Sequence, residues 1–408
     1  MPLEPRRTVA DLKELRELTG DEEGAQRVAW TETWERARKW LRDKIAETGA
    51  EEEIDAAGNQ WFTLLGSSER AVLIGGHIDS VPNGGWLDGA LNLVAGVEVL
   101  RRIAEEGTPP VTVRLVNWAD EEGARFGRSL FGSSAAAGSM TDQEELRGLR
   151  DRDGVTLPDA LREFGVDLDR ALDAQSQLEN AAAYLELHIE QGPVLESLDL
   201  PLGVVLGTFG VERHRITWQG QAAHAGSTPM DQRRDALAGA SKLALEIREV
   251  AERVGDGGVC TSGGVVCNPG IVTSVVETAE QLLDQRHLDG EKLASLLEQA
   301  KEASMRFATE EDLEVKWERL WSIEPILFDE TLVGFCDEAI HEVAGTSHML
   351  ASGPLHDAAE VSRAGVPTVM MFVQSLRGLS HTKLEDTREE HLELAVHAFD
   401  RLASKTIG

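Results

Sequence analysis

The chain has 408 residues, of which 41% are hydrophobic, so it can bury a sizeable core and form two domains. Its formal net charge of −32 at pH 7 disfavours binding to nucleic acids and to anionic membranes, because both attract basic surfaces. Three cysteines are too few for a disulfide framework and fit a reducing compartment. The sequence contains no apolar run of about 20 residues and no apolar leader near Met1, so we expect a cytoplasmic protein.

The first part of the chain predicts helices alternating with buried strands. Residues 31–48 carry apolar side chains at helical spacing, and a hairpin is expected around Gly58. A buried strand then begins at Ala71, followed by a helix over residues 89–106 and a second buried strand over residues 111–119. This order is typical of an α/β fold, in which helices flank a mixed sheet.

Residues with metal-binding chemistry follow the Ala71 strand. Side chains two apart in an extended chain point the same way, so Asp79 can orient the imidazole of His77 while His77 binds a metal. Asp88 stands at the start of the next helix, where the helix dipole stabilises a carboxylate. Alone, this pattern is more often a polar turn than a metal site.

Further acids and histidines accompany the later strands. Glu121 and Glu122 follow the strand at 111–119, where they form either a solvated turn or a pair with divided roles, one binding metal and one taking a proton from water. His188 is expected on the polar face of a strand that begins near Tyr184. His381 lies in a loop after a last buried strand, at 367–374. Considered one at a time, each of these side chains is most simply interpreted as a solvated polar residue.

Five potential ligands taken together favour a metal site. His77, Asp88, Glu122, His188 and His381 each lie on a strand or just past one, an arrangement that isolated accidents rarely produce. The set suits two divalent cations. Nitrogen and carboxylate ligands without thiolates favour zinc, with manganese, cobalt or nickel as alternatives. Asp88 is the candidate bridge, since one carboxylate can hold two ions about 3.5–4 Å apart.

Seven segments form a pattern shared with one known family. They are GGHIDSVPNGGWLDGALNLVAGVEVL, WADEEGARFG, HIEQGPVLE, HAGSTPM followed by RRDA, LDQRHLD, SGPLHDA and GLSHTKLED. The pattern resembles the hydantoinase/carbamoylase amidases, which include N-carbamoyl-L-amino-acid hydrolases, allantoate amidohydrolases and β-ureidopropionases. These amidases belong to the wider dinuclear aminoacylase and carboxypeptidase group. HIEQGP together with HAGSTPM distinguishes them from the related peptidases, which generally carry a carboxylate at the position of His188.

The resemblance implies a specific ligand set. His77 and Glu122 would bind separate ions, with Asp88 bridging the two. His188 and His381 would complete the two ligand sets. The resemblance thus implies two divalent metal ions in each subunit.

The resemblance also makes Glu121 the general base. The bound metals would lower the pKa of water and polarise a planar, amide-type carbonyl. Glu121 would take the proton from the attacking water and pass it to the departing nitrogen. This scheme requires no covalent intermediate.

Residues 208–323 predict a smaller, inserted α+β domain, while residues 1–207 and 324–408 form the catalytic domain. The resemblance implies that the insert is a lid and a dimer interface. In relatives, the histidine at the position of His224 reaches the active site of a neighbouring subunit and stabilises the tetrahedral oxyanion. From the sequence alone, His224 is equally well a polar residue just before a helix start at residues 227–229.

Arg286 has two interpretations. It shares a strand face with Asp284, which favours a structural salt bridge. In relatives, the matching arginine instead binds the carboxylate of the substrate, a role that suits the planar guanidinium. By the same resemblance, His356 is a substrate or oxyanion contact and Gln191 is a further substrate contact.

Two positions depart from the family pattern. Relatives commonly carry asparagine where this chain has Thr273, beside the substrate carboxylate, and a Gly-x-Gly-His-Asp loop where this chain has Leu355 before its histidine. Both changes lie at positions where contacts with the substrate would determine which substrate binds. An apolar Leu355 suits a hydrophobic side chain on the substrate.

The sequence and its resemblance together predict a metal-dependent amidohydrolase that acts on N-carbamoyl-L-amino acids, releasing amino acid, ammonia and carbon dioxide. Allantoate is the alternative substrate. Further alternatives are a hydrolase of N-acyl-amino acids or dipeptides, and a catalytically silent, metal-dependent binding module. The expected partners are a small-molecule substrate and a second copy of the chain, joined through the lid.

Overall fold

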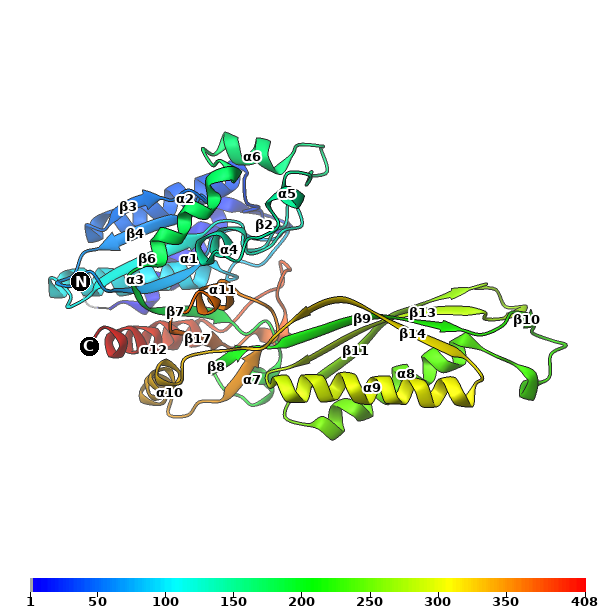
Figure 1. Ribbon diagram of the computed structural model, residues 1–408. Helices are drawn as coiled ribbons and strands as arrows, with labels where there is room; N and C mark the ends of the chain where they lie inside the picture. Colours follow the sequence, from blue (N-terminus) through cyan, green and yellow to red (C-terminus); the bar gives the residue numbers. More distant parts are fainter. Residues whose placement is uncertain (1–2) are drawn as a thin grey trace. The chain divides into compact units, whose positions relative to one another are not determined.

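The computed structural model describes residues 3–408, which divide into two compact units (Figure 1). The first unit comprises the described chain up to Gly207 together with Phe328–Gly408, and the second comprises Thr208–Leu327. The second unit is thus inserted into the sequence of the first. The predicted fold class, a mixed sheet flanked by helices with a smaller α+β unit, is confirmed. Among residues 3–408, no helix has both the length and the apolar character that crossing a membrane requires.

The first unit is built on a mixed sheet with the strand order β8-β17-β7-β5-β6-β4-β3, and β16 also pairs with β8. The four central strands, β6, β5, β7 and β17, are mutually parallel. The outer pairs β3/β4, β4/β6 and β8/β17 are antiparallel. The strands are β3 (Glu51–Ile54), β4 (Gln60–Leu64), β5 (Ala71–His77), β6 (Thr112–Trp118), β7 (Ala181–Ile189), β8 (Leu202–Thr208), β16 (Met349–Ser352) and β17 (Thr368–Val373).

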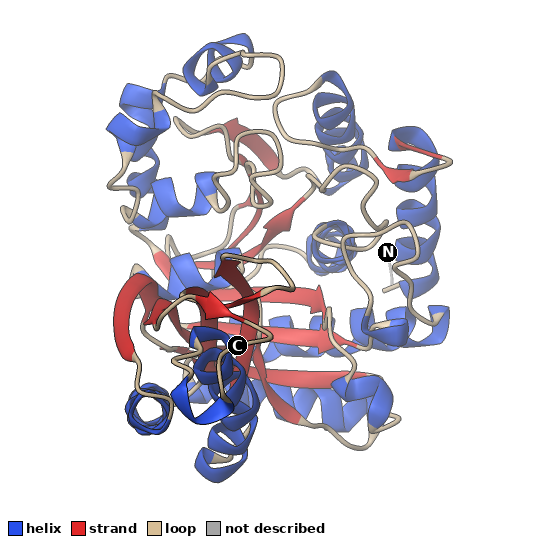
Figure 2. Cartoon of the chain, turned by 90° about the vertical axis from the view of Figure 1, so that its right-hand side faces the viewer, coloured by secondary structure: helices blue, strands red, loops and turns tan. Residues whose placement is uncertain are grey.

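Every residue of β5 and β17 is buried, because helices cover both faces of this sheet. One set contains α3, which packs on β5, and α12, which packs on β17 and β7, with α1 and α10 beside them; a second set, α4 and α11, contacts the same central strands. Figure 2 shows these helices in blue and the strands in red. The helices are α1 (Pro5–Thr19), α2 (Glu32–Ile45), α3 (Ala90–Glu106), α4 (Phe131–Ala137), α10 (Glu330–Ala344), α11 (Asp357–Arg363) and α12 (Glu389–Ile407).

Short elements complete the first unit. They are β1 (Gly20–Asp21), β2 (Gly24–Ala25), η1 (Ala46–Thr48), α5 (Gln143–Leu146), α6 (Leu157–Glu163), η2 (Leu168–Leu178), α7 (Val194–Ser197) and η4 (Leu376–Gly378). The elements expected from the sequence are present: α2 begins after Thr31, whose side chain accepts a hydrogen bond from the backbone N–H of Trp34, and β3 and β4 form the hairpin. The polar face of β7 carries His188 as expected, but it is buried rather than solvated: Glu186 and His188 are buried, and so is Glu190 just past the strand.

The second unit is an antiparallel sheet with the order β11-β13-β9-β14, packed against α8 and α9. Side chains of β13 alternate between buried and accessible, as expected for a sheet with one covered face. The core of the unit includes Ile216, Trp218, Leu243 and Phe307. Its elements are β9 (Gly210–Gln219), β10 (Ala223–His224), η3 (Met230–Gln232), α8 (Ala236–Val254), β11 (Val259–Asn268), β12 (Ser274–Val275), β13 (Thr278–His287), α9 (Gly290–Glu310), β14 (Glu314–Ile323) and β15 (Ile326–Leu327).

Candidate metal centre

The candidate ligands lie at the carboxyl ends of the parallel strands of the first unit. His77 is the last residue of β5, Glu121 and Glu122 follow β6, and His188 is the penultimate residue of β7. His381 follows β17 in the loop that leads to α12. Parallel strands end at the same edge of a sheet, which is where open α/β sheets bind ligands. The topology therefore brings residues from distant parts of the sequence to one edge.

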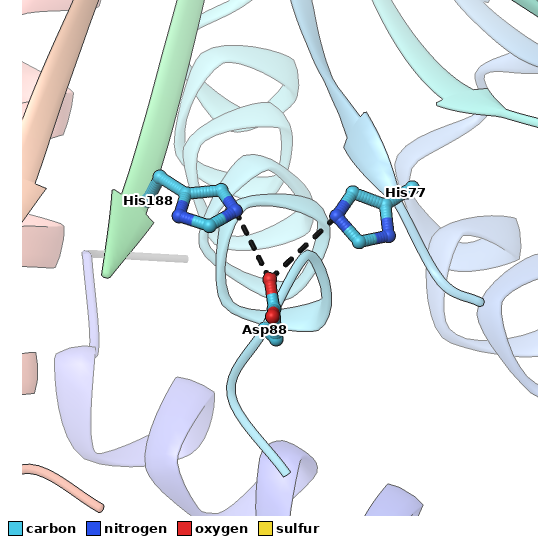
Figure 3. A group of neighbouring side chains, drawn as sticks. All are labelled: His77, Asp88 and His188. Atoms are coloured by element: carbon cyan, nitrogen blue, oxygen red, sulfur yellow. Dashed lines mark ion pairs between the residues drawn. The ribbon is translucent and has the colours of Figure 1, made fainter. Parts of the chain in front are cut away.

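The first group of converging side chains is His77, Asp88 and His188 (Figure 3). One potential ligand atom from each lies within 4.8 Å of the others, and all three residues are buried. The Oδ1 atom of Asp88 lies 3.7 Å from Nε2 of His77 and 3.1 Å from Nε2 of His188. Asp88 thus stands between two imidazoles that come from different strands.

Both imidazoles turn Nε2 toward Asp88 because their Nδ1 atoms face backbone carbonyl groups. Nδ1 of His188 lies 2.7 Å from the carbonyl oxygen of Ile189, and Nδ1 of His77 lies 3.2 Å from that of Asp79. A carbonyl oxygen only accepts hydrogen bonds, so we infer that each neutral ring carries its proton on Nδ1. The lone pair on Nε2 is then available to a metal ion.

The second group consists of Asp88, Glu122 and His381, again with potential ligand atoms within 4.8 Å of one another. Nε2 of His381 lies 3.4 Å from Oδ2 of Asp88 and 3.3 Å from Oε2 of Glu122. The side chain of His381 is 51% exposed, unlike the other four. Asp88 belongs to both groups and presents Oδ1 to the first and Oδ2 to the second.

The donor set fits a pair of divalent first-row ions. Across residues 3–408, the groups of three or more histidine, cysteine or acidic side chains that could hold an ion are these two, and they contain no thiolate. Imidazole and carboxylate ligands suit zinc, manganese, cobalt and nickel. A carboxylate that offers one oxygen to each group is the geometry that a shared ligand requires.

Acidic and imidazole groups of the site shift one another's pKa values. Burial and the nearby charge of Asp88 raise the pKa of Glu122 to about 7. Burial would raise the pKa of Asp88 as well, but hydrogen bonds from His188 and His381 hold that pKa well below its usual range. Contact with Asp88 raises the pKa of His381 to about 9. A bound cation would take the place of these protons.

Asp79 links the strand that carries His77 to the loop that carries the two glutamates. Oδ1 of Asp79 lies 3.5 Å from Nδ1 of His77. Its two carboxylate oxygens also accept hydrogen bonds from the backbone N–H groups of Glu121, at 3.4 Å, and Glu122, at 3.2 Å. Gly89 is needed beside this ring, because a Cβ atom there would overlap Cε1 of His77, and its φ of +64° disfavours other residues.

Glu121 stands beside the metal groups without belonging to either. Its Oε2 lies 3.8 Å from Nε2 of His77, and the residue is buried. Burial raises the pKa of Glu121 well above its usual range, although the nearby imidazole of His77 opposes the shift. A carboxylate with a raised pKa in this position can accept a proton and return it.

His356 is a buried imidazole on the His188 side of the site. The two ring centroids are 4.4 Å apart, and Nε2 of His356 lies 2.9 Å from Oγ of Ser352. Burial, and then the neighbouring charge of His188, lower the pKa of His356 well below its usual range. The ring is therefore neutral at physiological pH. Leu355, just before it in the sequence, is half-buried.

Gln191 lies directly beside the ligands. Its Nε2 donates a hydrogen bond to Oδ2 of Asp88 at 2.8 Å. The residue has a positive φ of 56°, a conformation that is uncommon outside glycine. The structure therefore shows Gln191 in contact with a candidate ligand.

His224 and Thr273 lie together at one tip of the second unit. β10 and β12 pair there, and the N–H of Ala225 donates to the carbonyl oxygen of Thr273 at 2.9 Å. Both residues are exposed. The segment after His224 is not an α-helix start, because residues 230–232 form a short 3₁₀ turn and α8 begins only at Ala236, capped by Asp235.

Arg286 forms the ion pair that its strand position predicts. Its Nε lies 2.7 Å from Oδ1 of Asp284, and Asp284 also binds Arg213 at 2.7 Å. The side chain is 28% exposed, so part of the guanidinium remains accessible. The salt bridge is therefore present in the second unit.

Three residues near the site escaped the sequence-based interpretation. Ser380 and Glu385 flank His381 within the segment GLSHTKLED, and their place in a motif was the one available signal. No motif or periodic pattern in the sequence pointed to Arg27. It is fully buried, and Nη1 and Nη2 have no hydrogen-bond partner among the described residues, while Nε donates to the carbonyl oxygen of Ile78 at 2.7 Å.

Comparisons with known proteins agree on one group of relatives. Residues 73–405 match peptidase family M20/M25/M40. An N-carbamoyl-L-amino acid amidohydrolase from Geobacillus stearothermophilus is 36% identical over 372 residues, which cover 90% of each chain. An allantoate amidohydrolase from Escherichia coli is 32% identical over 367 residues, covering 89% of this chain and 88% of the relative. The crystal structure of a hydantoinase/carbamoylase family amidase from Burkholderia multivorans, 29% identical, matches 100% of this chain and 98% of that one with a TM-score of 0.89.

Proposed function

Because the chain belongs to peptidase family M20/M25/M40 and, within it, to the hydantoinase/carbamoylase amidases, we propose that it hydrolyses the carbamoyl C–N bond of N-carbamoyl-L-amino acids. The chain is a hydrolase that acts on C–N amide bonds. The proposed products are an amino acid, ammonia and carbon dioxide. The observation that carries the proposal is the pair of ligand groups that share Asp88, with Glu121 beside them.

Enzymes of this family typically depend on divalent metal ions, and the two groups of side chains would hold two such ions. His77 and His188 would serve one ion, Glu122 and His381 the other, and Asp88 both. When bound, the ions would supply Lewis acidity, lowering the pKa of water and polarising the carbonyl group of the substrate. Zinc is the first candidate and manganese, cobalt and nickel are the others, since all accept imidazole and carboxylate ligands.

The proton transfers are assigned to Glu121. It accepts a proton from the attacking water and delivers it to the departing nitrogen, so the same carboxylate serves both halves of the reaction. Asp79 supports this role, because it holds the backbone N–H groups of Glu121 and Glu122 and contacts the His77 ring. His356 is proposed as a neutral substrate contact from the same unit.

The substrate carboxylate is assigned to Arg286, with Gln191 as a further contact. Thr273, which lies beside His224, is proposed as a contact from a second copy of the chain. A planar guanidinium can bind a carboxylate with two parallel hydrogen bonds. The ion pair with Asp284 would hold the guanidinium in place for this role, since it leaves the side chain partly accessible. Leu355 stands where relatives commonly have glycine, and the added apolar side chain supports a preference for substrates with hydrophobic side chains.

His224 is proposed as the donor to the oxyanion, with Nε2 as the donor atom. Nδ1 of His224 accepts hydrogen bonds from the backbone N–H groups of Gly226, at 3.1 Å, and Ser227, at 3.2 Å. A neutral ring that accepts at Nδ1 carries its proton on Nε2. The turn after His224 therefore presets the tautomer that oxyanion stabilisation needs.

We further propose that His224 acts in the active site of a second copy of the chain. β13 begins at Thr278, at the end of the sheet next to β12 and His224, and reaches Arg286 near its other end. Eight residues of strand separate Thr278 from Arg286, which corresponds to about 26 Å. Arg286 lies at the end where the chain enters and leaves the second unit, opposite Val211. If both residues contact one substrate molecule, they come from different chains, which supports a homodimer joined through the second unit.

Replacing His224 by alanine is expected to lower kcat by about 10²–10³-fold, the usual effect of removing one oxyanion donor. Metal content and dimer mass should not change, because the exposed ring contacts neither metal group. Steady-state kinetics, metal analysis and light scattering measure these quantities. His341→Ala, which removes a half-exposed imidazole from α10 in the first unit, is the control.

Mixed dimers decide whether His224 acts between chains. His224→Ala and Glu121→Gln chains, each with a different affinity tag, are coexpressed and the mixed dimers purified. If His224 acts in the partner, one site of each mixed dimer has both native residues, and about half of the native rate returns. If it acts within its own chain, no site is complete, and the mixed dimers stay as slow as the two parent variants.

The function itself is tested with a panel of N-carbamoyl-L-amino acids, their D-enantiomers, allantoate, N-acetyl-amino acids and dipeptides. The expected result is the highest kcat/KM on an N-carbamoyl-L-amino acid with an apolar side chain, and loss of activity on chelation that returns with zinc or manganese. Ammonia and free amino acid are measured as products. A preference for allantoate would replace the proposed substrate, and metal-loaded protein without activity on the panel would favour a binding module.

A further inference from the structure

Glu385 is a buried acid that lies directly behind Asp88. It is 2% exposed, and it belongs to the loop that follows His381. Its Oε1 accepts hydrogen bonds from the backbone N–H groups of Leu87 and Asp88, each at 3.0 Å. The carboxylate therefore holds the backbone of a candidate metal ligand that is 297 positions away in the sequence.

The side chain of Asp88 is held by the same cluster. Ser380 Oγ lies 2.9 Å from Oδ2 of Asp88 and 2.9 Å from Oε2 of Glu385. Gln191 Nε2 lies 2.8 Å from the same Asp88 oxygen and 3.0 Å from Ser380 Oγ. Ser380 and Gln191 thus both contact Oδ2 of Asp88, the oxygen that faces Glu122 and His381, while Oδ1 stays turned toward His77 and His188.

The loop before Asp88 is shaped to admit this carboxylate. A Cβ atom on Gly85 would overlap both Cδ and Oε1 of Glu385, so no larger residue fits there without moving the acid. Glycine at this position lets the loop close over the carboxylate. The contact is therefore built by two segments, the loop before α3 and the loop before α12.

A buried arginine carries charge opposite to that of Glu385. Arg27 is fully buried, and burial lowers the pKa of its guanidinium, while the negative charge of Glu385 opposes that shift. Burial, and then the charge of Asp88, raise the pKa of Glu385 to about 7. The hold of Glu385 on the Asp88 segment therefore rests on its hydrogen bonds to that segment.

We propose that Glu385, acting with Ser380, is a positioning residue that sets the rotation of the Asp88 carboxylate, so that one oxygen faces each ligand group. A rotated carboxylate would no longer offer one oxygen to each group, and the two ions could not share it. The inference deepens the proposed function and rests on it through the metal-binding role of Asp88. It does not depend on which substrate the enzyme takes.

Manganese binding to metal-free, full-length protein tests the proposal without any substrate. Titration calorimetry measures the Kd of each Mn²⁺ ion, and electron paramagnetic resonance reports whether two bound ions are magnetically coupled through a shared ligand. The variants are Glu385→Ala, Glu385→Gln and Ser380→Ala. The control is Asp55→Ala, because buried Asp55 also accepts two backbone N–H groups, from Ala57 and Asn59 at 2.9 and 3.0 Å, but belongs to neither metal group.

Glu385→Ala is expected to weaken Mn²⁺ binding by about 10–100-fold, the usual effect of removing a group that holds a metal ligand in place. The coupled signal should give way to that of separate ions. Glu385→Gln should restore most of both, because its amide oxygen can still accept from Leu87 and Asp88. Ser380→Ala should weaken binding by about 10-fold, and Asp55→Ala should bind as the native protein does.

Several outcomes would overturn the proposal. They are native Kd values and a coupled signal in Glu385→Ala, an equal loss in Asp55→Ala, and native protein that binds no Mn²⁺. If Glu385→Ala does not fold, native binding and coupling in Ser380→Ala would overturn it instead. Metal binding with the expected variant pattern, but without hydrolysis of N-carbamoyl-amino acids, would remove the proposed substrate and leave the positioning role standing.

Discussion

Glu121→Gln is expected to lower kcat by about 10²–10⁴-fold, the range that a general acid–base residue usually contributes. Glutamine keeps the size of the side chain but cannot take up a proton, so the attacking water is no longer deprotonated. Metal content should stay native, because Glu121 belongs to neither ligand group. The measurements are steady-state kinetics on the best substrate and metal analysis of the purified variant.

Glu98→Gln is the matched control for this variant. Glu98 is also a fully buried glutamate of the first unit, but it pairs with Arg7 at 2.8 Å and belongs to neither metal group. Its replacement should lower the melting temperature and leave kcat native, because it removes an ion pair away from the ligands. A near-native rate in Glu121→Gln would refute its assignment as the base. Loss of metal from that variant would make it a ligand instead.

Asp88→Asn is expected to weaken the binding of both metal ions, each by more than the roughly 10–100-fold that loss of a supporting group causes. Asp88 is the member that the two groups share, and the amide carries no negative charge to offer to either ion. Hydrolysis should fall with metal occupancy. Metal analysis after dialysis and calorimetric titration with Mn²⁺ or Zn²⁺ measure the change.

His381→Ala provides the contrast, because His381 belongs to one group only. This variant should lose affinity for one ion and retain the other, held by His77, Asp88 and His188. Two sites of native affinity in Asp88→Asn would contradict a shared ligand. Equal loss of both ions in His381→Ala would show that the two ions bind as one cooperative unit.

Sequence patterns alone identify the order of strands and helices and the residues that reach the metal groups. Strands of a parallel sheet are buried on both faces, so β5 and β17 are continuous apolar runs that are easy to recognise. Polar residues directly after such runs must lie at the carboxyl edge of the sheet. For this reason the amino-acid pattern places His77, at the end of β5, and Glu122, just past β6, at one edge of the sheet. His381, in contrast, lies eight residues past β17 and is joined to them by the full ligand set and the family resemblance.

How these residues are held depends on the tertiary structure. Alternating polarity in β7 suggested a solvated face for His188, but that face is buried, because helices pack against β7 in the folded chain. The contacts of Asp79 with both glutamate N–H groups and of Glu385 with Asp88 join distant segments, and no local periodicity marks them. Hydrophobic patterning reports which face of a strand or helix is buried, whereas the pairing of buried polar groups depends on which loops meet in space.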